Sequence, residues 1–198
     1  MPGKDRLGDY RRKRDFRRTG EPRGARRRRR SGEPRFVVQK HGARSLHYDF
    51  RLEADGVLKS WAVPKGPSRN PAEKVFATPT EDHPVEYAGF EGVIPEGQYG
   101  AGPVVIWDAG SYRNMTEDNG TQVPVADGIG RGHVVVWLEG EKLRGGYALT
   151  RMRRRGGTEG WLLVKMRDEA ADARHDPRRS EPASVRSGRT LEEVAKDG

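Results

Sequence analysis

The chain contains no cysteine. Disulfides and thiolate metal sites are therefore excluded, and any metal must be held by nitrogen and oxygen ligands. Long apolar runs are also missing, since none approaches the roughly 20 residues that a membrane-spanning helix needs. The N-terminus has no apolar signal-peptide core. We therefore expect a cytoplasmic protein with no membrane partner.

Apolar residues are scarce as well. Hydrophobic residues make up 33% of the 198 residues, and charged residues make up 34%. The length suits one domain of moderate size with tails. So polar a composition indicates that part of the chain lies outside a packed core.

Positive charge is concentrated at the N-terminus. Residues 1–35 carry 15 Lys or Arg against 5 Asp or Glu, whereas the other 163 residues are nearly balanced. The arm contains five consecutive arginines, Arg26, Arg27, Arg28, Arg29 and Arg30. An arginine block suits a nucleic-acid backbone through counterion release. A solvated tail without a specific partner is the alternative.

Beyond residue 34 the sequence predicts strands. Short runs of β-branched and aromatic residues alternate with turn signals. The expected strands are 36–40, 46–53, 57–63, 75–78, 104–108, 111–112, 133–138, 146–151 and 161–166. With 26 Gly and 13 Pro and few helical periods, this pattern favours an all-β barrel or sandwich in a compact single domain, with short helices or turns as connections.

The expected organisation has three parts. Residues 1–34 form a basic, partly disordered arm, in which a short helix is expected between Lys4 and Arg18 before Gly20 ends it. Residues 35–168 form the β domain. Residues 169–198 form a polar, flexible C-terminal tail, with one amphipathic turn near its end.

The strand expected at 46–53 carries the chemistry. Side chains alternate between the two faces of a strand, which puts His47, Asp49 and Arg51 on one face. The other face is apolar and predicts a core stripe, made of Leu46, Tyr48, Phe50 and Leu52. An imidazole and a carboxylate two residues apart can converge on one ion.

His41 lies six residues before His47, and a loop through Gly42 could return it to the same place. Two imidazoles and a carboxylate form a three-point site that suits Mn²⁺, Fe²⁺, Co²⁺ or Zn²⁺. Arg51 has the forked donors that bind phosphate. A half-exposed strand with an ordinary polar face explains the spacing equally well.

Other segments give weaker signals. His83 stands in a turn set by Pro84 and beside carboxylates, as a general acid or a phosphate ligand would, although a solvent-facing histidine fits better when this turn is read alone. The glycine-rich run 95–102 lacks the strand–loop–helix context of a nucleotide-binding loop, and we expect a tight connection. His133 and His175 are expected to be structural and solvated, respectively.

Three phrases resemble one family, the 3′-phosphoesterase module of bacterial DNA ligase D. They are RFVVQKHGARSLHYDFRLEADGVLKSWAVPKGPS, EDHPVEYAGFEGVIPEGQYGAGPVVIWDAGSY and, more loosely, GWLLVKM. The arm phrases YRRKRDF and GEP are also similar to the family. The resemblance covers most of the chain, which would be a stand-alone module.

The resemblance implies a compact β-barrel and a metal-dependent enzyme of non-homologous end joining. Such enzymes remove a 3′-terminal ribonucleoside and then the 3′-phosphate, usually with manganese, and Co²⁺ or Zn²⁺ is possible here. The implied metal ligands are His41, His47 and Asp49. The implied phosphate ligands are Arg51 and His83.

The resemblance implies further site residues. Tyr87 resembles the active-site tyrosine, Lys65 a supporting basic residue, and Gln39 and Glu81 residues that support the ligands. Contacts to nucleic acid are expected from Arg14, Asp15, Glu21, Gln39 and the arginine block Arg26–Arg30. The expected partners are a primer–template DNA, Ku and a separate ligase; the protein itself would be a nucleoid-associated monomer.

One position departs from the family. Val75 stands where the family carries an arginine, which would weaken one reaction step if that arginine contacts phosphate. Val75 also favours an alternative function, a non-catalytic nucleic-acid-binding scaffold. A metal hydrolase for another phosphate ester is a third possibility, against which the basic arm argues.

Overall fold

The computed structural model describes residues 5–24, 32–152 and 159–198. The arginine block Arg26–Arg30 lies outside the described residues. Helices are few and short among the residues that are described: α1 (Gly8–Arg12), η1 (Val85–Gly89, a 3₁₀ turn), α2 (Val125–Arg131), α3 (Pro177–Ser180) and α4 (Leu191–Ala195). None of them is long and apolar enough to cross a membrane.

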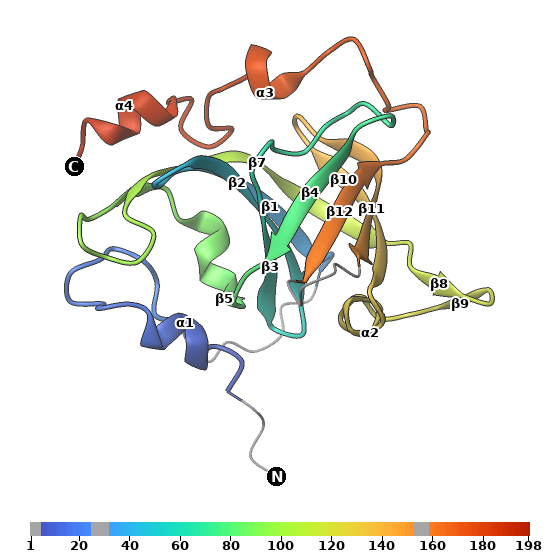
Figure 1. The fold of residues 1–198 in the computed structure, drawn as a ribbon, viewed down its shortest axis with the longest axis horizontal. Coiled ribbons are helices and arrows are strands. Elements are labelled where there is room, and N and C mark those ends of the chain that lie inside the picture. Colours follow the sequence, from blue (N-terminus) through green and yellow to red (C-terminus); the bar gives the residue numbers. More distant parts are fainter. Residues whose placement is uncertain (1–4, 25–31, 153–158) are drawn as a thin grey trace.

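Eight antiparallel strands form a closed barrel (Figure 1). In spatial order they are β1 (Arg35–Gly42), β2 (Leu46–Ala54), β3 (Val57–Val63), β4 (Lys74–Pro79), β12 (Gly160–Lys165), β11 (Arg144–Met152), β10 (His133–Gly140) and β7 (Gly102–Asn114). Pairing of β7 with β1 closes the ring. Closure leaves no open edge for another chain. The expected all-β barrel is therefore confirmed.

Short strands lie outside this ring. β5 (His83–Pro84) pairs with β3, and β6 (Gly92–Ile94) pairs with β7. β8 (Glu117–Asp118) and β9 (Thr121–Gln122) form a separate hairpin. The chain thus returns after β4 and places His83 beside β3, which itself pairs with β2.

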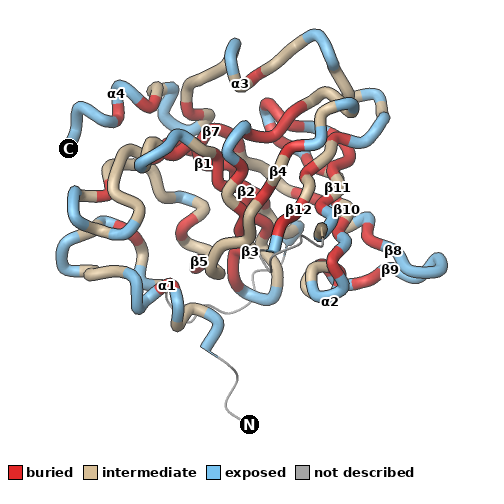
Figure 2. Tube along the Cα trace, in the orientation of Figure 1, coloured by how far each residue is buried: buried red, intermediate tan, exposed pale blue. Residues whose placement is uncertain are grey.

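The barrel interior is apolar and aromatic (Figure 2). Phe50 and Leu52 on β2 are fully buried, and Tyr48 is 5% exposed. Leu46 is an exception to the predicted stripe, because it begins the strand and is 51% exposed. Alternation therefore holds from Tyr48 onward, and the opposite face of β2 points away from the core.

Two predicted strands are one. The segments 104–108 and 111–112 belong to β7, which continues through Gly110. A Cβ atom at position 110 would lie only 2.0 Å from the carbonyl oxygen of Glu139. Gly110 therefore allows β7 to approach β10 closely within one continuous strand, where the sequence predicted two separate strands.

The expected tails both pack on the barrel over their described residues. Tyr10 of the arm is fully buried and donates its hydroxyl to the Pro22 carbonyl. In the C-terminal segment, Val194 is buried against Val105. The folded unit thus extends beyond 35–168, because a few apolar side chains in polar surroundings suffice to anchor each segment.

The strand register can be tested through stability. Phe50→Ala removes a buried ring and should lower the free energy of unfolding by about 3–5 kcal/mol. Leu46→Ala, on the same strand, should change it by less than about 0.5 kcal/mol. Urea titration followed by circular dichroism measures both. Equal costs for the two variants would contradict the register.

Candidate active site

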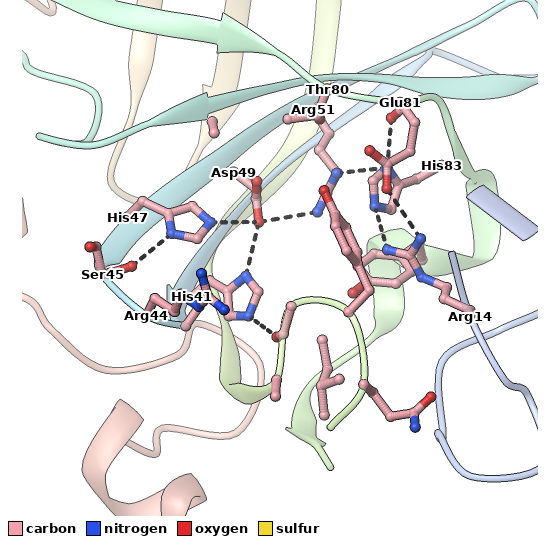
Figure 3. Close-up of a pocket in the computed structure, with 18 of the residues that line it drawn as sticks. Arg14, His41, Arg44, Ser45, His47, Asp49, Arg51, Thr80, Glu81 and His83 are labelled. Atoms are coloured by element: carbon pink, nitrogen blue, oxygen red, sulfur yellow. Dashed lines mark hydrogen bonds and ion pairs between the residues drawn. The ribbon is translucent and has the colours of Figure 1, made fainter. Parts of the chain in front are cut away.

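One cavity of about 960 Å³ is lined by eight of the residues that the sequence singled out (Figure 3): Arg14, His41, His47, Asp49, Arg51, Glu81, His83 and Tyr87. It opens between the β1–β2 hairpin, the segment that leads into β5, and the loop 95–101. The hairpin register brings the residues together, since His41 pairs directly with His47 and Gln39 pairs with Asp49. Side chains on this outer face of the hairpin therefore meet in one cluster.

His41, His47 and Asp49 form the candidate metal centre. One ligand atom of each lies within 4.8 Å of the others. Nδ1 of His41 is 3.5 Å from Oδ2 of Asp49, and Nε2 of His47 is 3.7 Å from the same oxygen. The cluster contains the nitrogen and oxygen donors that the sequence predicted for a divalent metal.

Backbone carbonyls fix the orientation of both imidazoles. Nε2 of His41 donates to the Gly100 carbonyl at 2.7 Å, and Nδ1 of His47 donates to the Ser45 carbonyl at 2.9 Å. A carbonyl only accepts, so these nitrogens carry the hydrogens. In the neutral rings the other nitrogens, which face Asp49, then carry lone pairs. This arrangement fits a bound cation and is the usual support of metal-binding histidines.

Arg51 is held rigidly beside this cluster. Its Nε donates to Oε1 of Gln39 at 2.8 Å, and its Nη2 lies 3.2 Å from Oδ2 of Asp49. Burial alone would raise the pKa of Asp49, but the neighbouring Arg51 guanidinium holds it well below its usual range. Asp49 is therefore ionised and can serve as a ligand.

His83 lies on the other side of Arg51. Nδ1 of His83 is 2.8 Å from the carbonyl of Glu81 and 3.0 Å from Nη1 of Arg51. Nε2 of His83 faces Nη2 of Arg14, which can only donate, so the hydrogen of the neutral ring is on Nδ1 and is donated to the Glu81 carbonyl. Nη1 of Arg51 then has no acceptor on His83. Burial, with Arg51 and Arg14 nearby, keeps the pKa of His83 well below its usual value. The ring is therefore neutral.

The N-terminal arm completes the site. Arg14 is buried, with its Nε 2.8 Å from Oε1 of Glu21 and its Nη1 3.1 Å from Oε1 of Glu81. Its Nη2 lies 3.3 Å from Nε2 of His83, which can accept. The hydroxyl of Tyr87 donates to Glu21 at 3.0 Å. Burial and Glu21 raise the pKa of Tyr87 well above its usual value, so the phenol stays neutral.

Comparison with known proteins agrees with this geometry. Residues 39–151 match the family model described as the DNA ligase D 3′-phosphoesterase domain. The chain belongs to this phosphoesterase family. It is 49% identical to the multifunctional non-homologous end joining protein LigD of Pseudomonas aeruginosa over 194 residues, which are 96% of the chain and 22% of that protein.

A second relative, the multifunctional non-homologous end joining DNA repair protein LigD of Mycobacterium tuberculosis, is 44% identical over 170 residues, 85% of the chain and 21% of that protein. The corresponding protein of Mycolicibacterium smegmatis is 44% identical over 168 residues, again 85% of the chain and 21% of the protein. The chain thus spans about a fifth of the length of these relatives. The family resemblance read from the sequence is confirmed.

Three residues expected to contact nucleic acid have protein partners in this structure. Gln39 is fully buried and accepts from Arg51, in agreement with its expected role as a support of the ligands. Asp15 pairs with Arg17 outside the cavity. Glu21 is buried as the partner of Arg14 and Tyr87. Contacts of these three residues to nucleic acid stay a prediction.

Lys65 and Val75 are not at this cavity. Both border a second cavity, of about 470 Å³, together with Lys74 and Arg178. Val75 is 3% exposed and packs in the barrel core. The structure therefore does not place Lys65 beside the metal cluster, and it gives no support to the idea that Val75 removes a phosphate contact from this site.

Sequence reasoning missed several residues at or next to the cavity. Lys13 does not line it, but its ammonium lies 3.0 Å from Oε2 of Glu81, which does. Gly100 supplies the carbonyl that orients His41, from the loop interpreted only as a connection. Arg44 and Tyr99 also line the cavity. Lys13 is one residue from Arg14, and Arg44 is three residues from both His41 and His47. This closeness to predicted site residues was the only signal for them in the sequence.

The protonation state of His83 can be measured directly. We expect its ring to stay neutral, as the Nδ1–H tautomer, at the pH where an ordinary histidine is half-protonated, because protonation would add a buried charge between two arginines. Long-range ¹H–¹⁵N correlation spectra of the ring report the tautomer and its titration. A midpoint at or above the ordinary histidine value of about 6.5 would contradict this assignment.

Proposed function

We propose that this phosphoesterase is a metal-dependent enzyme that repairs the 3′ ends of nucleic acids in non-homologous end joining. It removes a 3′-terminal ribonucleoside and a 3′-phosphate and leaves a 3′-hydroxyl. The observation that carries the proposal is the convergence of two oriented imidazoles and an ionised carboxylate beside Arg51. Family membership supports the same reaction class.

The ligands of the metal would be Nδ1 of His41, Nε2 of His47 and Asp49. Manganese is the proposed ion, with Co²⁺ or Zn²⁺ also compatible with this donor set. A divalent ion bound there supplies a Lewis acid for an oxygen of the phosphate. Three protein ligands leave positions open for substrate and water.

Arg51 provides the fixed positive charge of the reaction. Gln39, Asp49 and the face of Tyr87, whose ring centroid lies 4.9 Å from the guanidinium carbon, hold it in place. Its Nη1 donors remain for a phosphate oxygen. Because the guanidinium is already oriented, charge that develops on the phosphate is stabilised without reorganisation of the site.

His83 carries the proton that is donated to the phosphate or to the leaving oxygen. In the neutral ring Nε2 accepts from Arg14. A bound phosphate brings negative charge, which favours protonation at Nε2. The protonated nitrogen then donates to the phosphate or to the leaving oxygen. Tyr87 acts indirectly, since its hydroxyl is bound to Glu21 and its ring supports Arg51 and His83.

The partners follow from the same assignment. The substrate would be a primer–template DNA with a 3′-ribonucleotide or 3′-phosphate, and the basic arm, including Arg26–Arg30, would contact it. Ku and a DNA ligase are proposed as partners, and the nucleoid as the location. A non-catalytic scaffold loses its main support, because Val75 lies in the core and not at the site.

Replacing a ligand tests the proposal. Asp49→Asn keeps the shape of the side chain but removes the charge, and should lower kcat/KM on a 3′-phosphate primer at least about 100-fold. The measurement is phosphate release and gel mobility in the presence of manganese. Chelation of the metal should have a similar effect on the unaltered protein.

His133→Ala is the matched control, since it removes an exposed histidine on β10, away from the cavity. It should leave activity unchanged. If Asp49→Asn retains full activity, or if the unaltered protein with manganese releases neither phosphate nor nucleoside, the proposed function is wrong.

A further inference from the structure

Two side chains at the rim of the cavity have no role in the chemistry above. Three arginines line the cavity, and two of them, Arg14 and Arg51, are bound in ion pairs with buried carboxylates. Arg44 differs, because it is exposed and its guanidinium has no ion pair or hydrogen bond to any described residue. Arg44 therefore presents all of its donors to solvent beside the metal cluster.

Tyr99 is the second unassigned group. It is one of four large apolar side chains that are exposed in the described part of the chain, at 50%, and it is the one that lines this cavity. The loop holds it outward: Gly97 and Gly100 have φ values of 78° and 75°, and two backbone hydrogen bonds, from Gln98 to Pro95 and from Ala101 to Gln98, close the turn. Tyr99 belongs to none of the core clusters.

The two groups stand on opposite sides of the phosphate-binding residues. Arg44 lies beside His41 and His47, while Arg14 and His83 lie across the pocket (Figure 3). Tyr99 is on the side of Arg14, with its ring centroid 5.6 Å from the guanidinium carbon of Arg14 and 4.6 Å from Nζ of Lys13. The metal ligands and Arg51 therefore lie between a free cation and an exposed aromatic ring.

We propose that a nucleic-acid strand crosses the cavity between Arg44 and Tyr99. This rests on the proposed function and deepens it. Arg44 pairs with a backbone phosphate next to the reactive phosphate, since its fork matches phosphate oxygens. Tyr99 stacks on one of the two bases that flank the reactive phosphate, as exposed aromatic rings do in single-strand sites. The site thus accepts a polymer end in preference to a free phosphate ester.

Arg44 is tested by the salt dependence of binding. The probe is a DNA primer with one 3′-terminal ribonucleotide, kept intact by EDTA, and binding is followed by fluorescence anisotropy of a dye at its 5′ end. Arg44→Ala should weaken binding roughly tenfold at low salt and reduce the slope of log K against log salt by about one. Arg44→Lys should largely restore the slope.

Arg131→Ala is the control for net charge. Arg131 is an exposed arginine in α2 that pairs with Asp118 and does not line the cavity. Its removal should leave the slope near that of the unaltered protein. If Arg44→Ala and Arg131→Ala change the slope equally, Arg44 has no specific phosphate contact and its part of the proposal fails.

Tyr99 is tested with a fluorescent base. In the same primer, 2-aminopurine is placed at the last or the penultimate position, where stacking on the ring should quench its fluorescence on binding. Tyr99→Leu keeps bulk but should abolish the quenching at that position and weaken binding roughly tenfold, whereas Tyr99→Phe should retain both. Quenching that is absent at both positions, or that persists in Tyr99→Leu, overturns the stacking.

These outcomes are separable from the proposed function. If the unaltered protein trims the primer in manganese but neither variant changes binding, the strand path is wrong and the phosphoesterase assignment stands. If the unaltered protein binds the primer with the expected salt slope and quenching but never cleaves it, the path stands and the reaction is wrong.

Discussion

The register between β1 and β2 is the constraint on which the rest of the site depends. It sets His41 opposite His47 and Gln39 opposite Asp49, while Phe50 and Leu52 point into the core. A slip of one residue would exchange the two faces of one strand and bury the charged groups. The apolar face thus fixes the position of the metal ligands, so core packing and site geometry have one common cause.

The second requirement is charge compensation. Asp49, Arg51, Arg14 and Glu21 have side chains that are at most 9% exposed, and each faces an opposite charge. Removing one member of such a pair costs more than the pair contributes, because the other charge stays buried. The arm supplies two of these four residues, and the barrel supplies the other two. The site is therefore electrically complete only when both segments are folded together.

Much of the barrel and of the candidate site could be predicted from the sequence. Alternation along 46–53 predicted which face of the strand carries the candidate ligands, and the strand boundaries were close, because period-two patterning and turn glycines are local signals. Leu46 was misplaced because alternation does not tell where burial begins. The prediction divided β7 into two strands around Gly110, because the close approach of Glu139 depends on the tertiary structure and cannot be seen in the sequence.

Other features were beyond the sequence for the same reason. The arm was expected to be a partly disordered basic segment that contacts nucleic acid, and only the fold shows that Glu21 and Glu81 meet around Arg14. Lys65 was assigned by resemblance, although it lies at another cavity in this structure. Gly100 orients His41 through a backbone carbonyl, and a carbonyl has no signature in the sequence.

Closure of the barrel has a consequence for motion. β1 is hydrogen-bonded to β2 along one edge and to β7 along the other, with one irregularity at Val38–Gln39. A strand bonded on both edges cannot open without unfolding of its neighbours, so its amides should exchange with solvent only through large-scale opening. His41 thus stands on an element that is hydrogen-bonded along both edges, and the candidate ligands keep their mutual positions as long as the barrel stays folded.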